Sequence, residues 1–173
     1  MSWPGPRSLD GGVDEIVVDG RPTGLWLCGK RVTGPDPEAA IARVEGVDTS
    51  DVAVLCLCEP HEIDERYPDY LAWLEANEGT RSMWRPMPDL SAPPIEQARS
   101  IAAEINERLD AGQSLLVHCG AGIGRAPTLA ICALLGRGYA LDELIQAVAD
   151  SRPMAGPETG DQQDLVKAVS AEH

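Results

Sequence analysis

The chain has 173 residues, 43% of them hydrophobic, and a formal net charge of −14 at pH 7. This length corresponds to one domain with a real core, which aliphatic and alanine side chains must fill because phenylalanine is absent. The negative charge argues against nucleic acid or an acidic membrane as a partner, but it still permits a small phosphate site where local dipoles dominate.

The beginning of the chain has neither the basic segment nor the apolar core of a signal peptide. No apolar run approaches the roughly 20 residues that a membrane-spanning helix needs. The five cysteines are an odd number, which without a secretion signal favours reduced thiols. We therefore expect a soluble, cytoplasmic protein.

The predicted elements follow a tail or strap over residues 1–12, which is rich in proline and glycine, and belong to one domain over residues 13–173. Apolar, β-branched runs predict strands, and stripes of apolar residues at helical spacing predict helices. The expected strands are residues 15–18, 24–28, 52–58, 82–87 and 114–117, and the expected helices are residues 37–44, 67–77, 94–109, 125–136, 141–150 and 160–170. Their alternation predicts an α/β fold with a mostly parallel central sheet, in which ligands bind beyond the carboxyl ends of the strands.

The segment after the last expected strand carries the chemistry. The strand leads into Cys119, small residues follow, and Arg125 stands where the next helix begins. Gly120, Gly122 and Gly124 permit tight curvature, so that backbone N–H groups and the helix N-terminus can converge on an anion. The same positive field favours the nucleophilic thiolate of Cys119, and the guanidinium of Arg125 can bind two phosphate oxygens. The Cys-x5-Arg spacing alone is unspecific, but together these features favour a phosphate site over a core thiol in an ordinary turn.

This segment resembles the active-site loop of the cysteine-dependent protein tyrosine and dual-specificity phosphatases, whose motif is His-Cys-x5-Arg. His118, Cys119 and Arg125 match the motif residue by residue. The resemblance implies that Cys119 forms a phosphocysteine, that Arg125 binds the phosphoryl group, and that His118 holds the shape of the loop. It also implies that loop amides cradle the phosphate oxygens, namely those of Gly120, Ala121, Gly122, Ile123 and Gly124. The fold implied is a single three-layer domain of about five strands, of the short dual-specificity type, with no metal and no cofactor.

A general acid should protonate the oxygen that leaves during phosphoryl transfer. Asp89 is the candidate, because it follows an expected strand and lies in a proline-bounded loop thirty residues before Cys119. The family commonly carries proline just before its acid, and Pro88 stands there, although Pro-Asp also forms ordinary turns. Asp69 is the runner-up among the three other carboxylates that fit less well, which are Asp64, Asp69 and Glu96.

One position departs from the family pattern, and another resembles it. Ala126 stands where the family usually has serine or threonine, whose hydroxyl assists breakdown of the phosphoenzyme, and Thr128 is two residues too late for simple replacement. We therefore expect a slow second step or compensation by another polar group. Arg152-Pro153 followed by Gln162 resembles a late family segment, so Gln162 is a candidate for positioning water, with a solvated helix start as the alternative.

The cysteines near residue 57 admit three interpretations. Cys56, Cys58 and His61 resemble part of a zinc site, but a structural site needs four ligands and no second cluster exists, so we expect core thiols. Some family members carry a cysteine at the end of this strand that forms a reversible disulfide with the nucleophile. By that resemblance, Cys58 is a possible redox partner of Cys119.

These features predict a protein phosphatase that hydrolyses phosphotyrosine, and also phosphoserine or phosphothreonine, in a phosphoprotein substrate. Four aromatic residues are candidates for the rim of the site or for core packing: Tyr67, Tyr70, Trp73 and Trp84. An inositol-phosphate or phosphoinositide phosphatase is an alternative, although such relatives tend to place lysine in the loop. A low-activity phosphopeptide-binding module is another, which Ala126 leaves open. No pattern indicates the oligomeric state.

Overall fold

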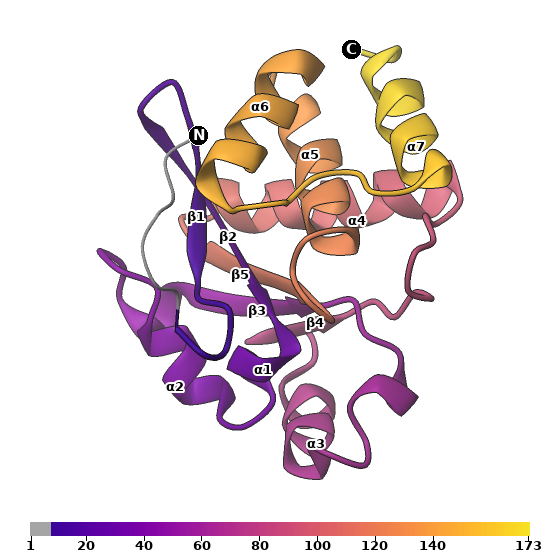
Figure 1. Ribbon diagram of the computed structural model, residues 1–173. Coiled ribbons are helices and arrows are strands. Elements are labelled where there is room, and N and C mark those ends of the chain that lie inside the picture. The colour runs from indigo at the N-terminus through magenta and orange to yellow at the C-terminus, as the bar shows by residue number, and fades with distance from the viewer. Residues whose placement is uncertain (1–7) are drawn as a thin grey trace.

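A five-stranded sheet of order β1-β2-β5-β3-β4 organises the computed structural model, which describes residues 8–173 (Figure 1). Its strands are β1 (Asp14–Val18), β2 (Arg21–Gly29), β3 (Val52–Cys56), β4 (Ser82–Trp84) and β5 (Ser114–Cys119). The pair β1–β2 is antiparallel and the other three pairs are parallel. All residues of the central strand β5 are buried, as its continuous apolar run predicts. The expected mostly parallel α/β sheet is confirmed.

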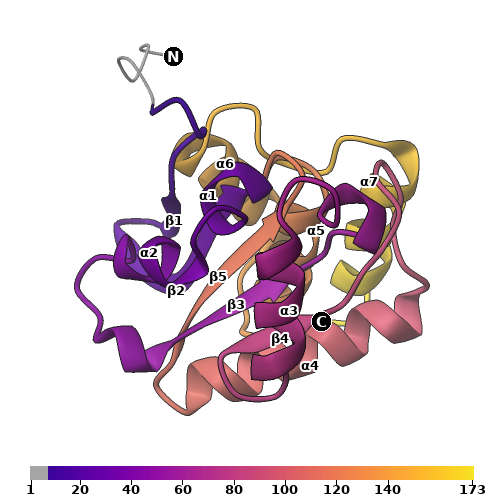
Figure 2. The ribbon, with the colours of Figure 1, turned by 90° about the horizontal axis from the view of Figure 1, so that it is seen from below.

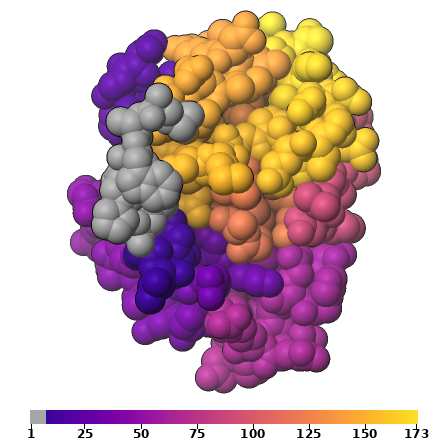
Figure 3. Space-filling model, viewed as in Figure 1, coloured from indigo at the N-terminus to yellow at the C-terminus, as the bar shows by residue number. Residues whose placement is uncertain are grey.

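Helices cover both faces of the sheet and complete the three expected layers (Figures 1 and 2). One face carries α1 (Lys30–Thr33), α2 (Pro37–Ala42) and α3 (Pro68–Asn77). The other carries α4 (Ile95–Asp110), α5 (Arg125–Leu135), α6 (Leu141–Ser151) and α7 (Gly160–Ser170). In the space-filling view the second group forms most of the upper part of the molecule and the first group most of the lower part (Figure 3).

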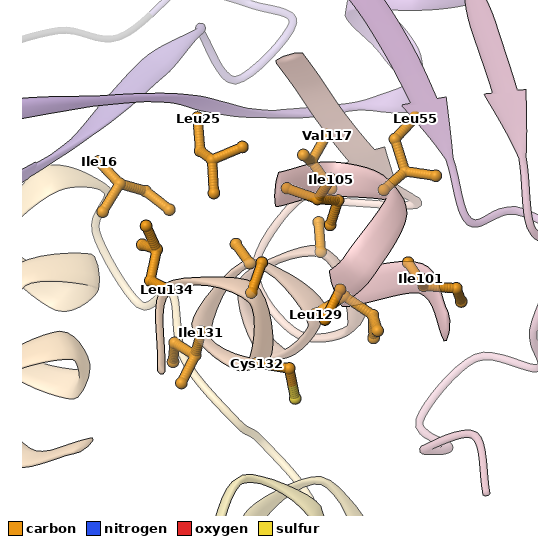
Figure 4. Close-up of a cluster of buried hydrophobic side chains, with 14 of the residues drawn as sticks. Ile16, Leu25, Leu55, Ile101, Ile105, Val117, Leu129, Ile131, Cys132 and Leu134 are labelled. Carbon is orange, nitrogen blue, oxygen red and sulfur yellow. The ribbon is translucent and has the colours of Figure 1, made fainter. Parts of the chain in front are cut away.

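Helix α5 is the centre of the larger core, because all of its residues are buried. Side chains from the sheet and from α4 point toward it (Figure 4), among them Ile16, Leu25, Val117, Ile101 and Ile105. The start of this helix, where the site lies, is therefore held rigidly from all sides.

The strand ends differ from the expected ones for local reasons. β3 stops at Cys56 and β4 at Trp84, where Pro86 and Pro88 remove backbone donors. β5 runs on to Cys119 because it stays paired with β2 there. The structure adds α1 and two short 3-10 turns, Thr49–Asp51 and Pro60–Glu62, which are too short to produce a periodic pattern.

The expected tail over residues 1–12 lies partly outside the described residues, which begin at residue 8. Within the described chain, no helix combines the length and apolar character that crossing a bilayer requires.

Candidate active site

Cys119 ends β5 at the carboxyl edge of the sheet, and the loop of residues 120–124 joins it to α5. Its side chain is only 3% exposed and lies with the core cluster around α5, while the preceding residue, His118, faces the opposite side of the sheet. A parallel sheet with this strand order brings the ends of β2 and β3 to either side of Cys119. The nucleophile predicted from the sequence thus lies at the expected ligand-binding edge.

Neighbouring segments hold the loop carbonyls outward. The carbonyl of Gly120 accepts a hydrogen bond from the Lys30 amide at 3.0 Å, and the carbonyl of Ile123 accepts one from the Gly156 amide at 2.9 Å. The carbonyl of Ala121 accepts one from Nη2 of Arg152 at 2.8 Å. In a trans peptide the N–H points away from the C=O, so the amides that follow these three carbonyls point into the loop. These contacts favour the expected cup of N–H donors, whose binding of phosphate stays a prediction.

Glycine is required in the loop by close backbone contact. Gly122 has a φ of +77°, and a Cβ atom there would lie 2.3 Å from the carbonyl oxygen of Cys28. A Cβ atom on Gly124 would lie 2.3 Å from a carboxylate oxygen of Glu158. A side chain at position 122 would displace the loop from β2, whereas one at position 124 would meet the flexible end of the Glu158 side chain.

Arg125 begins α5 and is 2% exposed. Its Nη1 donates to the carbonyls of Met87 at 2.9 Å and Leu57 at 3.3 Å, so the guanidinium is tied to the segments that follow β4 and β3. Nε is buried and has no hydrogen-bond partner within the described residues. Within the described chain, Nε is thus the nitrogen of this guanidinium that carries no hydrogen bond.

Glu62 holds the other edge of the guanidinium, and no sequence pattern predicts this contact. Its carboxylate makes a two-pronged pair with Arg125, at 2.8 Å to Nη1 and 2.7 Å to Nη2, and its side chain is 12% exposed. Burial alone would raise the pKa of Glu62, but the hydrogen bonds and charge of Arg125 outweigh it, and the pKa lies below its ordinary value. Burial would lower the pKa of Arg125, yet the bonds from Glu62 raise it above its usual range. The pair therefore keeps the guanidinium charged and oriented.

We expect Glu62→Gln to lower the free energy of unfolding by about 1–3 kcal/mol at neutral pH, because the buried guanidinium loses its counter-charge. The depressed pKa of Glu62 means that its contribution is complete above the ordinary value of 4.5 and is lost as the pH falls through the folded-state pKa. The difference between wild type and variant should therefore shrink below a pH of about 4.5, which urea unfolding at several pH values measures. Exposed Glu65→Gln is the matched control. A difference that stays constant with pH would contradict the assignment.

Asp89 lies on the same cavity as Cys119 and Arg125. This cavity has a volume of about 210 Å³ and is lined by Asp89, Leu90, Cys119, Ala121, Ile123, Gly124, Arg125 and Glu158. An oxygen of Asp89 lies 3.4 Å from Nη2 of Arg125, and the side chain is 69% exposed. The rivals differ: Asp64 and Asp69 are exposed and lie outside the cavity lining, and Glu96 pairs with Arg99 on α4. Of the four candidate acids, Asp89 is the one that lines this cavity, and its role as general acid stays a prediction.

Gln162 is buried at the start of α7 and bridges two walls of the cavity. Its Nε2 donates to the carbonyl of Ser91 in the acid loop at 3.1 Å, and its Oε1 accepts from the Glu158 amide at 2.8 Å. The alternative of a solvated helix start does not describe this residue. The contacts assign it a structural task, and its role toward water stays a prediction.

The structure shows whether a nearby hydroxyl can replace the one that Ala126 lacks. Ala126 is fully buried, and the Thr128 hydroxyl donates to the Gly124 carbonyl at 2.8 Å within the first turn of α5. The Thr128 hydroxyl thus already has a hydrogen-bond partner. This agrees with its position two residues beyond the place where the family has its hydroxyl.

His118 supports the loop from behind. Its Nδ1 lies 3.2 Å from the carbonyl oxygen of Cys119, and its Nε2 bonds to the Tyr70 hydroxyl. Tyr70 is therefore a core residue, and none of the four aromatic candidates lines the cavity. All four pack in or against one core cluster, which was the second alternative for them: Tyr67, Tyr70, Trp73 and Trp84.

Cys58 follows the end of β3 and is fully buried beside Cys56 and His118. The Cys56 thiol and burial raise the pKa of Cys58 above its usual range. A disulfide with Cys119 stays a prediction. His61 points into solvent, with a side chain that is 74% exposed, and cannot join a buried site with these thiols.

The fold and the site together define a cysteine-dependent phosphatase, in which a thiol, an arginine and a carboxylic acid line one cavity. The family model of the Swiss Army Knife protein DSP-PTPase phosphatase domain (PTP-SAK) matches residues 46–165. The chain belongs to this family.

Solved structures agree with that membership. The active form of Tk-PTP is 29% identical, with a TM-score of 0.62, over 79% of this chain and 87% of that one. A glycine-to-alanine mutant form of Tk-PTP is 31% identical, with a TM-score of 0.60, over 71% of this chain and 79% of that one. Kinase associated phosphatase shares the fold, with a TM-score of 0.72 at 18% identity over 96% of this chain and 99% of that one. A search of curated proteins finds no match.

Proposed function

We propose that this protein hydrolyses phosphotyrosine, and also phosphoserine or phosphothreonine, in protein substrates through a phosphocysteine intermediate. The observation that carries the proposal is the single cavity shared by Cys119, Arg125 and Asp89. Each is a residue type that one step of a two-step phosphoryl transfer needs.

In the first step, the Cys119 thiolate attacks phosphorus, and the bond from phosphorus to the substrate oxygen breaks. The loop amides and Arg125 bind the equatorial oxygens, where charge is spread in the transition state. Asp89, in its acid form, donates a proton to the leaving oxygen. Its exposed position near the mouth of the cavity supports this role, because the leaving group stays attached to a large substrate.

In the second step, water attacks phosphorus and the bond to sulfur breaks, which releases inorganic phosphate and the thiolate. The Asp89 carboxylate, deprotonated by the first step, accepts the proton of the water. Gln162 is our candidate for orienting that water, since its side chain already joins the acid loop to the cavity wall.

A comparison of substrates tests the proposal. We expect kcat/KM to be highest for a phosphotyrosine peptide, lower for the matched phosphoserine peptide and lowest for a soluble inositol polyphosphate. The reason for the last expectation is that two carboxylates, Asp89 and Glu158, line the cavity, and no lysine does. A preference for the inositol polyphosphate would overturn the proposed substrate class. Binding of phosphopeptide without turnover would favour the phosphopeptide-binding module.

We expect wild-type protein to accumulate phosphocysteine, and Ala126→Ser to speed its breakdown about tenfold or more, because a hydroxyl beside the departing thiolate stabilises its charge. Rapid-quench measurement of the phosphoenzyme during turnover of p-nitrophenyl phosphate gives both rates. Ala130→Ser, buried one turn further along α5, is the control for added polarity in this helix. No accumulation in wild type together with no gain in Ala126→Ser would show that another group already does this work.

A further inference from the structure

A second cluster of reactive side chains lies behind the catalytic loop. The thiols of Cys56 and Cys58 and the imidazole of His118 bring one donor atom each to within 4.8 Å of one another. All three residues are fully buried. His61 is the histidine nearest to these thiols along the chain, but His118 is the one that lies beside them in the structure.

The sheet explains why these three side chains meet. Cys56 in β3 pairs directly with His118 in the neighbouring strand β5, so their side chains share a face. Cys58 lies two residues beyond Cys56 and packs in the same cluster, under Tyr70 and Leu74 of α3. Cys119 faces the other side, so the cluster is separate from the catalytic cavity.

The hydrogen bonds of His118 set the tautomer of its ring. Nδ1 faces the carbonyl oxygen of Cys119, which can only accept, so Nδ1 carries the proton. Nε2 then holds a lone pair, which the Tyr70 hydroxyl contacts as a donor. A histidine whose second nitrogen donates to a carbonyl is the usual arrangement of a metal ligand, because that bond fixes the ring and its tautomer.

We propose that Cys56, Cys58 and His118 bind a Zn²⁺ ion, with the Tyr70 hydroxyl oxygen as the fourth donor. Two sulfurs and one imidazole nitrogen are a donor set that zinc prefers, whereas calcium and magnesium require oxygen. Binding forms two zinc–sulfur bonds and releases the two thiol protons to solvent. Two thiolates neutralise the dication, so the complex has no net charge in an apolar core. With zinc–sulfur bonds of about 2.3 Å, the donor atoms must approach one another by only about 1 Å.

The ion would be a positioning element for the loop, because His118 connects it to the backbone of Cys119. It would contact neither the substrate nor the reacting atoms. The proposal rests on the cluster alone and does not depend on the proposed phosphatase reaction.

The test uses Cys119→Ser as the parent, so that the catalytic thiol cannot bind the metal. The protein is produced with added Zn²⁺ or Co²⁺, because the buried ligands load best as the chain folds. We expect about one metal per chain by elemental analysis, and a thiolate-to-cobalt charge-transfer band in the cobalt form. Adding Cys56→Ala or Cys58→Ala should lower the retained metal at least tenfold, while adding Cys132→Ala, a buried thiol on α5, should not.

X-ray absorption at the zinc edge of the parent decides the matter even if a variant fails to fold. Two sulfur neighbours at about 2.3 Å with nitrogen or oxygen neighbours at about 2.0 Å would support the site. Absence of metal from the parent, or metal that is retained equally in both alanine variants, would overturn it. Either result leaves the phosphatase proposal untouched, since that proposal is measured separately with Cys119 present.

Discussion

Substitution of Cys119 by serine should lower kcat for p-nitrophenyl phosphate by about 10⁴-fold or more, the loss expected when the nucleophile of a covalent mechanism is removed. Serine keeps the size of the side chain but offers a hydroxyl that the loop cannot ionise. Phosphate binding should survive, because the loop carbonyls are held by Lys30, Arg152 and Gly156, none of which the substitution touches. Steady-state kinetics and binding of inorganic phosphate by calorimetry measure the two effects.

Cys132→Ser is the matched control for this substitution. Cys132 is a buried thiol on α5 that lines no part of the cavity, so activity per folded molecule should stay within a few-fold of wild type. Residual turnover in Cys119→Ser above one part in about a thousand would contradict a covalent role for the thiol.

Asp89→Asn should lower kcat by about 10²- to 10³-fold, the usual contribution of a positioned general acid. The loss should be larger for a phosphotyrosine peptide than for p-nitrophenyl phosphate, because p-nitrophenolate leaves readily without a proton. The limb of the pH–rate profile that reports the acid should disappear at the same time. Initial rates from about pH 4 to pH 9 on both substrates measure these changes.

The control here is Asp69→Asn, which alters an exposed carboxylate at the start of α3 outside the cavity lining. It should leave both the rate and the pH profile unchanged. An Asp89→Asn variant that loses rate equally on both substrates and keeps its pH profile would show that Asp89 orients the loop without donating a proton.

Much of this site could be predicted from sequence because it lies in two short, locally ordered segments. An apolar strand, three glycines and a helix start indicate Cys119 and Arg125, and a proline-bounded loop together with the family resemblance indicates Asp89. Each of these signals is local, and the parallel sheet then brings the two segments to the same edge.

Glu62 could not be predicted in the same way, since it is 63 positions from its partner Arg125 and belongs to no motif. Only the strand order shows that the turn after β3 adjoins the loop after β5. Cys56 and Cys58 are buried free thiols, as expected, but their histidine neighbour could not be predicted, for the same reason. His61 is close to the two thiols along the chain, whereas His118 is close to them across the sheet. Tyr70 likewise looked like a candidate for the rim until α3 was placed over that cluster.

The guanidinium of Arg152 has a practical consequence for anyone who handles this protein. It joins the Ala121 carbonyl to the carbonyls of Gly11 and Gly12 and to the Asp14 carboxylate. Residues 11–14 are therefore linked, through Arg152, to the loop that follows Cys119. We expect a tag or a cut close to residue 11 to disturb the loop that follows Cys119. The C-terminal end of α7 is the safer position for a tag.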